Sequence, residues 1–373
     1  MSVGLGPVSV TIRALASLRK SWRRSLRTSA RRRSIGSALI GNLLQAPTVY
    51  RHGSSLPRSP RAGVGYPPFS WDAGLPRVAA SSGVERGIVP VTSLADILKP
   101  AFEQRYGVPA INIVNDLTME NVLAGAVEVR SPIIVQTSVK TVKTIGTHVL
   151  HAMWEAMTRG IEVPACLHLD HCPERQVITD CLAEGWNSVL FDASLLPVEE
   201  NQRQTVEVVA EARRYGAHVE GEIESITGQE DGVGSDEESR QQTAEVTLTY
   251  LRETGVDVFA PAIGNAHGRY KRAPILDFQR VTDLVTAHPI PMTLHGGSGL
   301  SDEQFQDLIA RGCAKVNIST ALKERFMQSS LGYLKEAEAA DKWDPPSLFK
   351  VVAADIRDLT KGYAEVFGSA GKA

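Results

Sequence analysis

The sequence predicts an α/β protein, in which a closed barrel of eight parallel strands follows a long, disordered basic extension. Short apolar runs alternate eight times with longer helical patterns, beginning near residue 91. The runs are mostly apolar rather than alternately apolar and polar, which is typical of strands covered on both faces. Such alternation over about 230 residues favours a (β/α)8 TIM barrel. An open doubly wound sheet is the alternative, but the Gly-x-Gly-x-x-Gly turn of its dinucleotide-binding form does not follow the first predicted strand.

The predicted strands and helices follow one another in regular order. The apolar runs are Pro109–Val114, Ile133–Ser138, Ala165–Asp170, Ser188–Ser194, Ala217–Glu224, Val258–Gly264, Pro291–Gly296 and Lys315–Thr320. The clearest helical patterns cover residues 119–130, 199–215, 243–255, 277–287 and 301–312. In the last of these, Ser301 and Gln304 form a capping box and Gly312 is placed as a C-cap.

Residues 1–88 are predicted to lie outside the barrel domain, which covers residues 89–373. Residues 1–71 hold 12 of the 40 Lys and Arg but none of the 42 Asp and Glu. A basic, acid-free segment is typical of a transit peptide, and the Pro- and Gly-rich stretch 46–88 is typical of a linker. We therefore expect a cytoplasmic protein, or a mitochondrial one if the extension is a targeting segment. A disordered tail without that role and a misassigned gene start are the alternatives.

Composition excludes several classes of protein. The barrel domain is acidic, which argues against nucleic acid as a partner. The longest apolar runs are too short to span a bilayer. The four cysteines are scattered, without a Cys-x-x-Cys pair, and are expected to be reduced intracellular thiols.

Polar residues gather at the ends of the predicted strands. Active sites of (β/α)8 barrels lie at the carboxyl ends of the strands, and buried polar groups are costly unless they are paired. The residues at these ends are Asn112, Ser138, Asp170, His171, Asp192, Glu220, Glu222, His267, His295, Asn317, Ser319 and Thr320. A polar residue near the end of every strand therefore predicts a functional site at the mouth of the barrel.

Three histidines, His171, His267 and His295, come from three different strand ends. Three neutral imidazoles with an open fourth position are typical of a catalytic zinc site. The rival ligands are His168 and His218, which also lie on predicted strands. Next to His171, Asp170 is a candidate for proton transfer to a substrate whose carbonyl the metal polarises.

Glycine-rich turns follow two of these histidines and indicate a phosphate site. Their exposed backbone N–H groups, together with a helix that begins after the last strand, are suited to binding an anion. The residues concerned are Gly268, Lys271, Gly296, Ser298, Asn317, Ser319 and Thr320. The long polar segment 225–239 is a candidate for a loop that closes over the substrate and carries Glu230, although a solvated acidic loop has the same composition.

Eight segments of the chain resemble the class II, zinc-dependent fructose-bisphosphate and tagatose-bisphosphate aldolases, especially the class IIB branch. They occur in the family's order over about residues 91–325, and the 28-residue step from His267 to His295 fits as well. The segments are VPAINIVND, SPIIVQTS, HLDHC, GWNSVLFDAS, VEGEIESITGQEDG, AIGNAHGRYK, LHGGSGLS and KVNISTALK.

The resemblance implies a lyase of carbohydrate metabolism, such as glycolysis, that makes or breaks a carbon–carbon bond, with dihydroxyacetone phosphate as one half. It implies that His171, His267 and His295 bind zinc, and that Asp192 and Glu222 hold the metal in an alternative location. Asp170 and Glu230 would be the acid–base residues. The substrate pocket would comprise Gly268, Lys271, Gly296, Ser298, Asn317, Ser319 and Thr320, and a sodium or potassium ion often lies near its glycines. Asn112 and Ser138 are assigned to substrate binding by their place at strand ends. The family is usually dimeric or larger, so we expect a homodimer or homotetramer, with the C-terminal helical segment 346–366 available for contact.

The sequence departs from the family pattern at three places, of which Ser319 is uninformative because the family varies there between acidic and small residues. Glu224 stands where the family often has glycine. Pro346 follows Asp344 and Pro345 where the family often has an arginine that binds the far phosphate, so a bidentate phosphate partner is missing. The alternatives are therefore the same chemistry on an aldehyde half without a second phosphate, hydrolysis by a metal on the same barrel, and a non-catalytic metabolite-binding protein.

Overall fold

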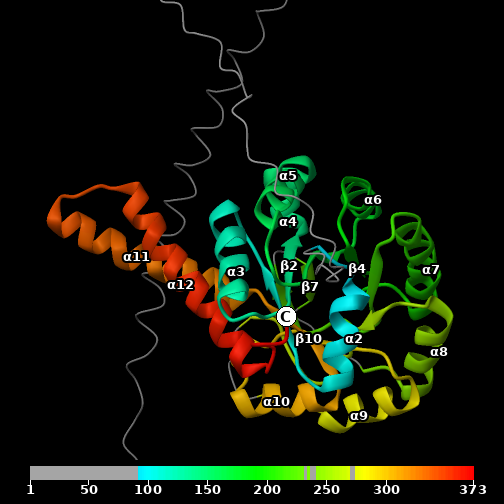
Figure 1. Ribbon diagram of the computed structural model, residues 1–373. Helices are drawn as coiled ribbons and strands as arrows, with labels where there is room; N and C mark the ends of the chain where they lie inside the picture. The colour runs from blue at the N-terminus through cyan, green and yellow to red at the C-terminus, as the bar shows by residue number, and fades with distance from the viewer. Residues whose placement is uncertain (1–90, 231–232, 236–240, 269–273) are drawn as a thin grey trace, which may run out of the picture. The chain divides into compact units, whose positions relative to one another are not determined.

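The computed structural model describes residues 91–230, 233–235, 241–268 and 274–373, and it confirms the predicted barrel (Figure 1). Eight parallel strands close in the order β1-β10-β9-β8-β5-β4-β3-β2. They are β1 Val108–Asn112, β2 Ile133–Ser138, β3 Ala165–Cys172, β4 Ser188–Asp192, β5 His218–Glu222, β8 Val258–Phe259, β9 Met292–Leu294 and β10 Cys313–Ile318. The predicted extension lies outside the described residues, so its targeting role stays a prediction.

Helices surround the barrel and connect successive strands (Figure 1). They are α2 Leu94–Gln104, α3 Asp116–Glu128, α4 Val139–Ile145, α5 Thr147–Thr158, α6 Arg175–Glu184, α7 Val198–Arg214, α8 Ala244–Thr254, α9 Phe278–Ala287, α10 Asp302–Arg311, α11 Thr320–Ala340 and α12 Pro345–Val366. The capping box predicted for α10 is present, since Ser301 Oγ accepts from Gln304 N–H and Gln304 Oε1 accepts from Ser301 N–H. Among the described helices, no helix is long and apolar enough to cross a membrane.

Two predicted elements differ from the structure. The strand predicted over Val258–Gly264 pairs only at Val258 and Phe259, because the following apolar residues are buried without being part of the sheet. Burial and strand pairing produce the same apolar pattern, so the sequence could not separate them. Segment 225–239, expected to be a loop, contains a two-stranded antiparallel hairpin of β6 Gly228–Glu230 and β7 Val233–Ser235.

The amino end of the barrel is closed by α2. Its apolar residues Leu94, Ile97 and Leu98 are buried in one cluster with Val108 at the start of β1 and with residues of β2, β3, β8 and β10. Burying such a side chain contributes about 1.5–3 kcal/mol. The amino end of the barrel is therefore filled by apolar side chains. Buried polar groups gather instead at the carboxyl ends of the strands.

The last two helices form a hairpin attached to the outside of the barrel. Helix α12 packs against α3 and β1, and α11 packs against α12 (Figure 1). Gly125 of α3 permits the close approach, because a Cβ atom there would lie 2.9 Å from Arg357 O. The end of the hairpin, between α11 and α12, lies away from the barrel in Figure 1.

Candidate metal centre and active site

The structure brings the three predicted histidine ligands together at the carboxyl ends of the strands. His171 lies on β3, whereas His267 and His295 follow β8 and β9. Their candidate ligand nitrogens lie within 4.8 Å of one another. His171 Nε2 and His295 Nδ1 are 2.7 Å apart, and the His267 ring centroid lies 4.8 Å from that of His171. Three imidazoles from separate strands thus converge on one point.

An irregularity in β3 lets two adjacent residues serve this point. The pairing register of β3 with β4 shifts between Leu169 and Cys172, and His171 has a φ of 42°. A left-handed conformation is uncommon for a non-glycine residue and is often found at functional sites. Both Asp170 and His171 are consequently turned to the mouth of the barrel, although neighbouring residues on a regular strand point to opposite faces.

Carboxylates orient two of the imidazole rings. His171 Nδ1 lies 2.9 Å from Asp192 Oδ2, and His295 Nε2 lies 2.7 Å from Glu220 Oε1. When these nitrogens donate to the carboxylates, His171 Nε2 and His295 Nδ1 are the nitrogens left to bind a metal once both rings are neutral. This tautomer is the one that a metal ligand requires.

A buried lysine holds Glu220 in place. Lys315 Nζ lies 2.8 Å from Glu220 Oε2 and donates to Asn317 Oδ1, and all three side chains are buried. Burial alone would raise the pKa of Glu220, but Lys315 and His295 outweigh it, so the pKa lies well below its ordinary value. Glu220 therefore stays ionised as the partner of His295. The pairing of Lys315 with Glu220 was not predicted from the sequence. A lysine inside the otherwise apolar run CAKVNI was the available signal.

A second group of candidate ligands shares His171 with the first. It consists of His171, Asp192 and Glu222, whose ligand atoms again lie within 4.8 Å of one another. Glu222 is 1% exposed, and its Oε2 accepts no hydrogen bond from the described residues. Burial and the neighbouring Asp192 carboxylate raise the pKa of Glu222 well above its ordinary value. Concentrated buried acids with an unsatisfied oxygen, beside three imidazoles, fit a bound divalent cation.

Asp170 is fixed by two amides beside this centre. Asn112 Nδ2 donates to Asp170 Oδ2 at 2.9 Å, and Asn317 Nδ2 donates to Asp170 Oδ1 at 3.1 Å. Asn112 in turn accepts from Gln136 Nε2. The carboxylate is 1% exposed and is held in one orientation next to His171.

The predicted phosphate residues lie at the ends of β8, β9 and β10. Gly268 and Gly296 have φ values of 81° and 65°, and a Cβ atom on Gly296 would lie 2.3 Å from Ala266 O. Ser319 Oγ is buried without a hydrogen-bond partner among the described residues, and Thr320 begins α11. Ser298, half-buried, lies in the turn after His295.

Of the remaining predicted site residues, Ser138 has a structural role, and the Glu230 side chain and Lys271 lie outside the described residues. Ser138 caps α4 by accepting from Thr141 N–H, so its hydroxyl has a structural partner. Glu230 belongs to β6, but its side chain is outside the described part, as is all of Lys271.

The two rival histidines lie elsewhere. His168 Nδ1 is 2.7 Å from Ser188 Oγ inside the barrel, and burial together with Lys315 lowers its pKa to about 3. His218 begins β5, at the amino end of the strand, with its Nε2 4.0 Å from Asp257 Oδ1. Neither belongs to a candidate metal cluster in the described residues.

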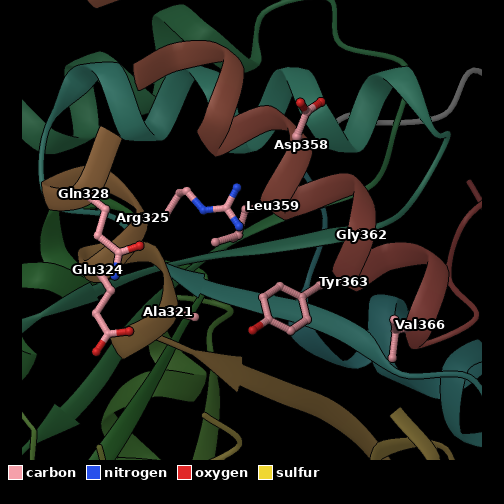
Figure 2. A pocket seen from close by; sticks show the side chains of 9 residues that line it. All are labelled: Ala321, Glu324, Arg325, Gln328, Asp358, Leu359, Gly362, Tyr363 and Val366. Atoms are coloured by element: carbon pink, nitrogen blue, oxygen red, sulfur yellow. The ribbon is translucent and has the colours of Figure 1, made fainter. Parts of the chain in front are cut away.

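A separate hollow of about 450 Å³ lies between α11 and α12 (Figure 2). Figure 2 shows Arg325 of α11 and Tyr363 of α12 among the side chains that line it. None of the predicted site residues lines this hollow, although Ala321 in its wall directly follows Thr320. The hollow is therefore distinct from the histidine cluster.

Comparison with known proteins places this geometry in a family. The family described as Fructose-bisphosphate aldolase class-II matches residues 92–372. A putative fructose-1,6-biphosphate aldolase from Coccidioides immitis is similar at 28% identity and a TM-score of 0.69, over 75% of this chain and 97% of the other. The YdjI aldolase from Escherichia coli K12 is similar at 28% identity and a TM-score of 0.67, over 76% and 99% of the two chains.

A fructose-bisphosphate aldolase from Campylobacter jejuni has the same fold at 20% identity, with a TM-score of 0.66 over 76% of this chain and 97% of the other. The family match spans the whole barrel and both C-terminal helices. This chain therefore belongs to the class II fructose-bisphosphate aldolase family, whose members cleave and form carbon–carbon bonds by aldol chemistry.

Proposed function

We propose that the protein is a zinc-dependent aldolase of a ketose phosphate, with dihydroxyacetone phosphate as one half and a fructose 1,6-bisphosphate-type sugar as the substrate. The observation that carries this proposal is the convergence of His171, His267 and His295 beside the fixed carboxylate of Asp170. Family membership supports the aldol chemistry. The choice of zinc rests on the donor set, because three imidazoles with an open position suit a catalytic zinc ion.

A zinc ion held by the three histidines would act as a Lewis acid on the ketone group of the substrate. Asp192 and Glu220 keep the rings of His171 and His295 in the tautomers that leave one nitrogen of each for the metal. Asp192 and Glu222, with His171, are proposed to hold the ion in a second location. No lysine Schiff base is required by this scheme.

The proton transfers are assigned to two acids of the chain. Asp170 is proposed to exchange a proton with the hydroxyl or aldehyde oxygen, since Asn112 and Asn317 hold its carboxylate in a fixed orientation. Glu230, on the hairpin of β6 and β7, is proposed to exchange the proton at the carbon next to the ketone. Both roles remain proposals that substitution tests.

The phosphate of the dihydroxyacetone half is proposed to bind at the turns after β8, β9 and β10. Gly268 and Gly296 adopt left-handed backbone conformations there, which glycine favours. The start of α11 at Thr320 presents N–H groups with the positive end of the helix dipole. Ser319 Oγ is a buried hydroxyl without a described partner, which an anion would satisfy. Ser298 and Lys271 complete the proposed pocket, near which a sodium or potassium ion is also proposed.

The test is a cleavage assay on the full-length protein, with and without a strong chelator. The substrates are fructose 1,6-bisphosphate, tagatose 1,6-bisphosphate, fructose 1-phosphate and sedoheptulose 1,7-bisphosphate, and the readout is triose-phosphate release. We expect chelator-sensitive cleavage of a bisphosphate, restored by zinc. Cleavage of only the monophosphate would exclude the bisphosphate assignment, and cleavage that persists in chelator would contradict the metal mechanism.

The affinity for zinc is expected to fall as the pH is lowered. In the metal-free protein, burial lowers the pKa of His171, but the Asp170, Asp192 and Glu222 carboxylates outweigh it and raise the pKa well above 6.5. Zinc must displace this proton, so below that pKa the apparent affinity should fall about tenfold per pH unit. Competition with a chelating dye from pH 5 to pH 8 measures the apparent affinity for zinc. An affinity independent of pH would contradict the proposed ligand role of His171.

Self-association through the α11–α12 hairpin is part of the proposal. Six of the twelve exposed large apolar side chains in the described residues lie there: Met327, Leu331, Leu334, Trp343, Phe349 and Val351. A mainly apolar hollow of about 120 Å³ lies among Tyr333, Trp343 and Leu348. A symmetric contact between two copies would cover this surface. Since α11 is 21 residues long and spans roughly 30 Å, position 346 beyond its far end is remote from the strand ends at which α11 begins.

We expect Leu331→Glu to dissociate the oligomer, so that the molecular mass in solution falls to half of the wild-type value or less. The reason is that the new carboxylate would lie within the apolar contact surface. Light scattering during size-exclusion chromatography measures the mass. Val206→Glu on α7, which is also exposed, is the control and should keep the wild-type mass. A monomeric wild-type protein at micromolar concentration would refute the proposed contact.

A further inference from the structure

Glu224 forms a buried junction just beyond the end of β5. Its side chain is inaccessible, and its carboxylate accepts three hydrogen bonds. Oε1 accepts from Gln242 N–H at 2.6 Å and from Arg280 Nη2 at 2.5 Å, while Oε2 accepts from Ala262 N–H at 2.8 Å. Glycine, which the resemblance favours at this position, would have no group to make these bonds.

This junction ties together the two ends of segment 225–241. Glu224 directly precedes the segment and Gln242 directly follows it, so the bond from Gln242 N–H closes the segment at its base. Arg280 of α9 strengthens the closure by donating from Nη1 to Gln242 O at 2.9 Å. The segment carries the hairpin of β6 and β7, and with it Glu230.

The same junction is linked to the metal-ligand segment after β8. Ala262 lies five residues before His267, and Gln241 Nε2 also donates to Ala262 O. Further along, Thr227 pairs with Ala266, and His267 N–H donates to Thr227 O at 2.8 Å. A Cβ atom on Gly228 would lie 2.7 Å from His267 O, so the two backbones are in close contact. The hairpin segment and the His267 segment are therefore held to each other at two levels.

Both side chains of the Glu224–Arg280 ion pair are largely buried. Burial raises the pKa of Glu224, while Arg280 and the two backbone amides oppose that rise. A buried ion pair contributes little net stability, but loss of one partner leaves the other charge buried and unpaired. A buried ion pair can therefore favour one arrangement of the segments that it joins, as a single buried polar residue fixes the register of some coiled coils.

We propose that Glu224 is a positioning residue, which through Arg280, Gln242 and Ala262 sets the place of the hairpin that carries Glu230 relative to His267. The proposal deepens the proposed function and rests on it for the role of Glu230. Its consequence is that the proton-transferring acid and one metal ligand share a common anchor. A change at Glu224 would therefore move Glu230 relative to His267 without removing either residue.

The test compares Glu224→Gln with Glu211→Gln. Glu211 is a matched control, because it also forms a mostly buried pair with an arginine, Arg175, but joins α6 to α7 away from the hairpin. Amide hydrogen exchange and cleavage kinetics are measured on full-length protein loaded with zinc. For Glu224→Gln we expect faster exchange at Gln242, Ala262 and His267, a kcat lower by on the order of 10–100-fold, a KM within about threefold of wild type, and unchanged zinc content.

Arg280→Lys is the second variant, in case Glu224→Gln folds poorly. It keeps the positive charge but loses the second guanidinium bond to Gln242 O, so a smaller change in the same direction is expected. Exchange rates and kcat equal to those of the Glu211→Gln control would overturn the proposal. Absence of cleavage by the wild-type protein would refute the proposed function instead, and faster exchange at the three amides would still support the junction.

Discussion

Replacing Asp170 by asparagine is expected to lower the rate of aldol cleavage by about 10²–10⁴-fold while zinc stays bound. The carboxylate oxygens of Asp170 accept from Asn112 and Asn317, and Asp170 belongs to neither candidate metal cluster in the described residues. Asparagine has nearly the same shape but cannot exchange a proton. The change therefore removes the proposed acid–base group together with one of the two accepted hydrogen bonds, because an amide nitrogen cannot accept.

Steady-state kinetics and zinc content by elemental analysis test this expectation together. Asp180→Asn on α6 is the control, because Asp180 is exposed and accepts from Gln176 of its own helix. The control should keep wild-type activity. If Asp170→Asn retains activity within about threefold of wild type, Asp170 is not the acid–base residue. If it loses zinc, the residue supports the metal site instead.

Replacing Lys315 by methionine is expected to lower the free energy of unfolding by about 3–5 kcal/mol. Lys315 and Glu220 are both buried, with Nζ and Oε2 2.8 Å apart. Methionine fills similar space but leaves the Glu220 carboxylate without a cationic lysine beside it, with His295 and His168 as its remaining partners among the described residues. An uncompensated carboxylate inside the barrel is the source of the penalty.

A double variant separates charge from packing. Lys315→Met combined with Glu220→Gln removes both charges and keeps an oxygen to accept from His295 Nε2–H, so most of the lost stability should return. Urea unfolding of the metal-free protein measures all three forms. Exposed Lys335→Met on α11 is the control and should change the free energy little. A loss under 1 kcal/mol in Lys315→Met, or no recovery in the double variant, would contradict the role of the pair.

The sequence alone determined the architecture and the approximate place of the site. Strands buried on both faces appear in the sequence as apolar runs, and helices appear as periodic patterns with capping residues. Their eightfold alternation is compatible with few folds. The strand ends of such a barrel meet at one mouth whatever the details, so His171 and His295 could be expected to converge although they are 124 residues apart. The apolar pattern did not determine where strand pairing ends. Strand β8 covers only Val258–Phe259, although the apolar run continues to Gly264.

Only the tertiary structure decided how the site residues are used. Asp170 and His171 face the same point because His171 adopts a left-handed conformation, which a strand pattern does not predict. Lys315 and Glu220 pair across the barrel interior, and Glu224 pairs with Arg280, 56 residues away. Propensity and periodicity describe neighbours along the chain, whereas these pairs depend on the three-dimensional register of strands and helices. The tautomers of the histidines, and the anchor of the hairpin that carries Glu230, follow from that register.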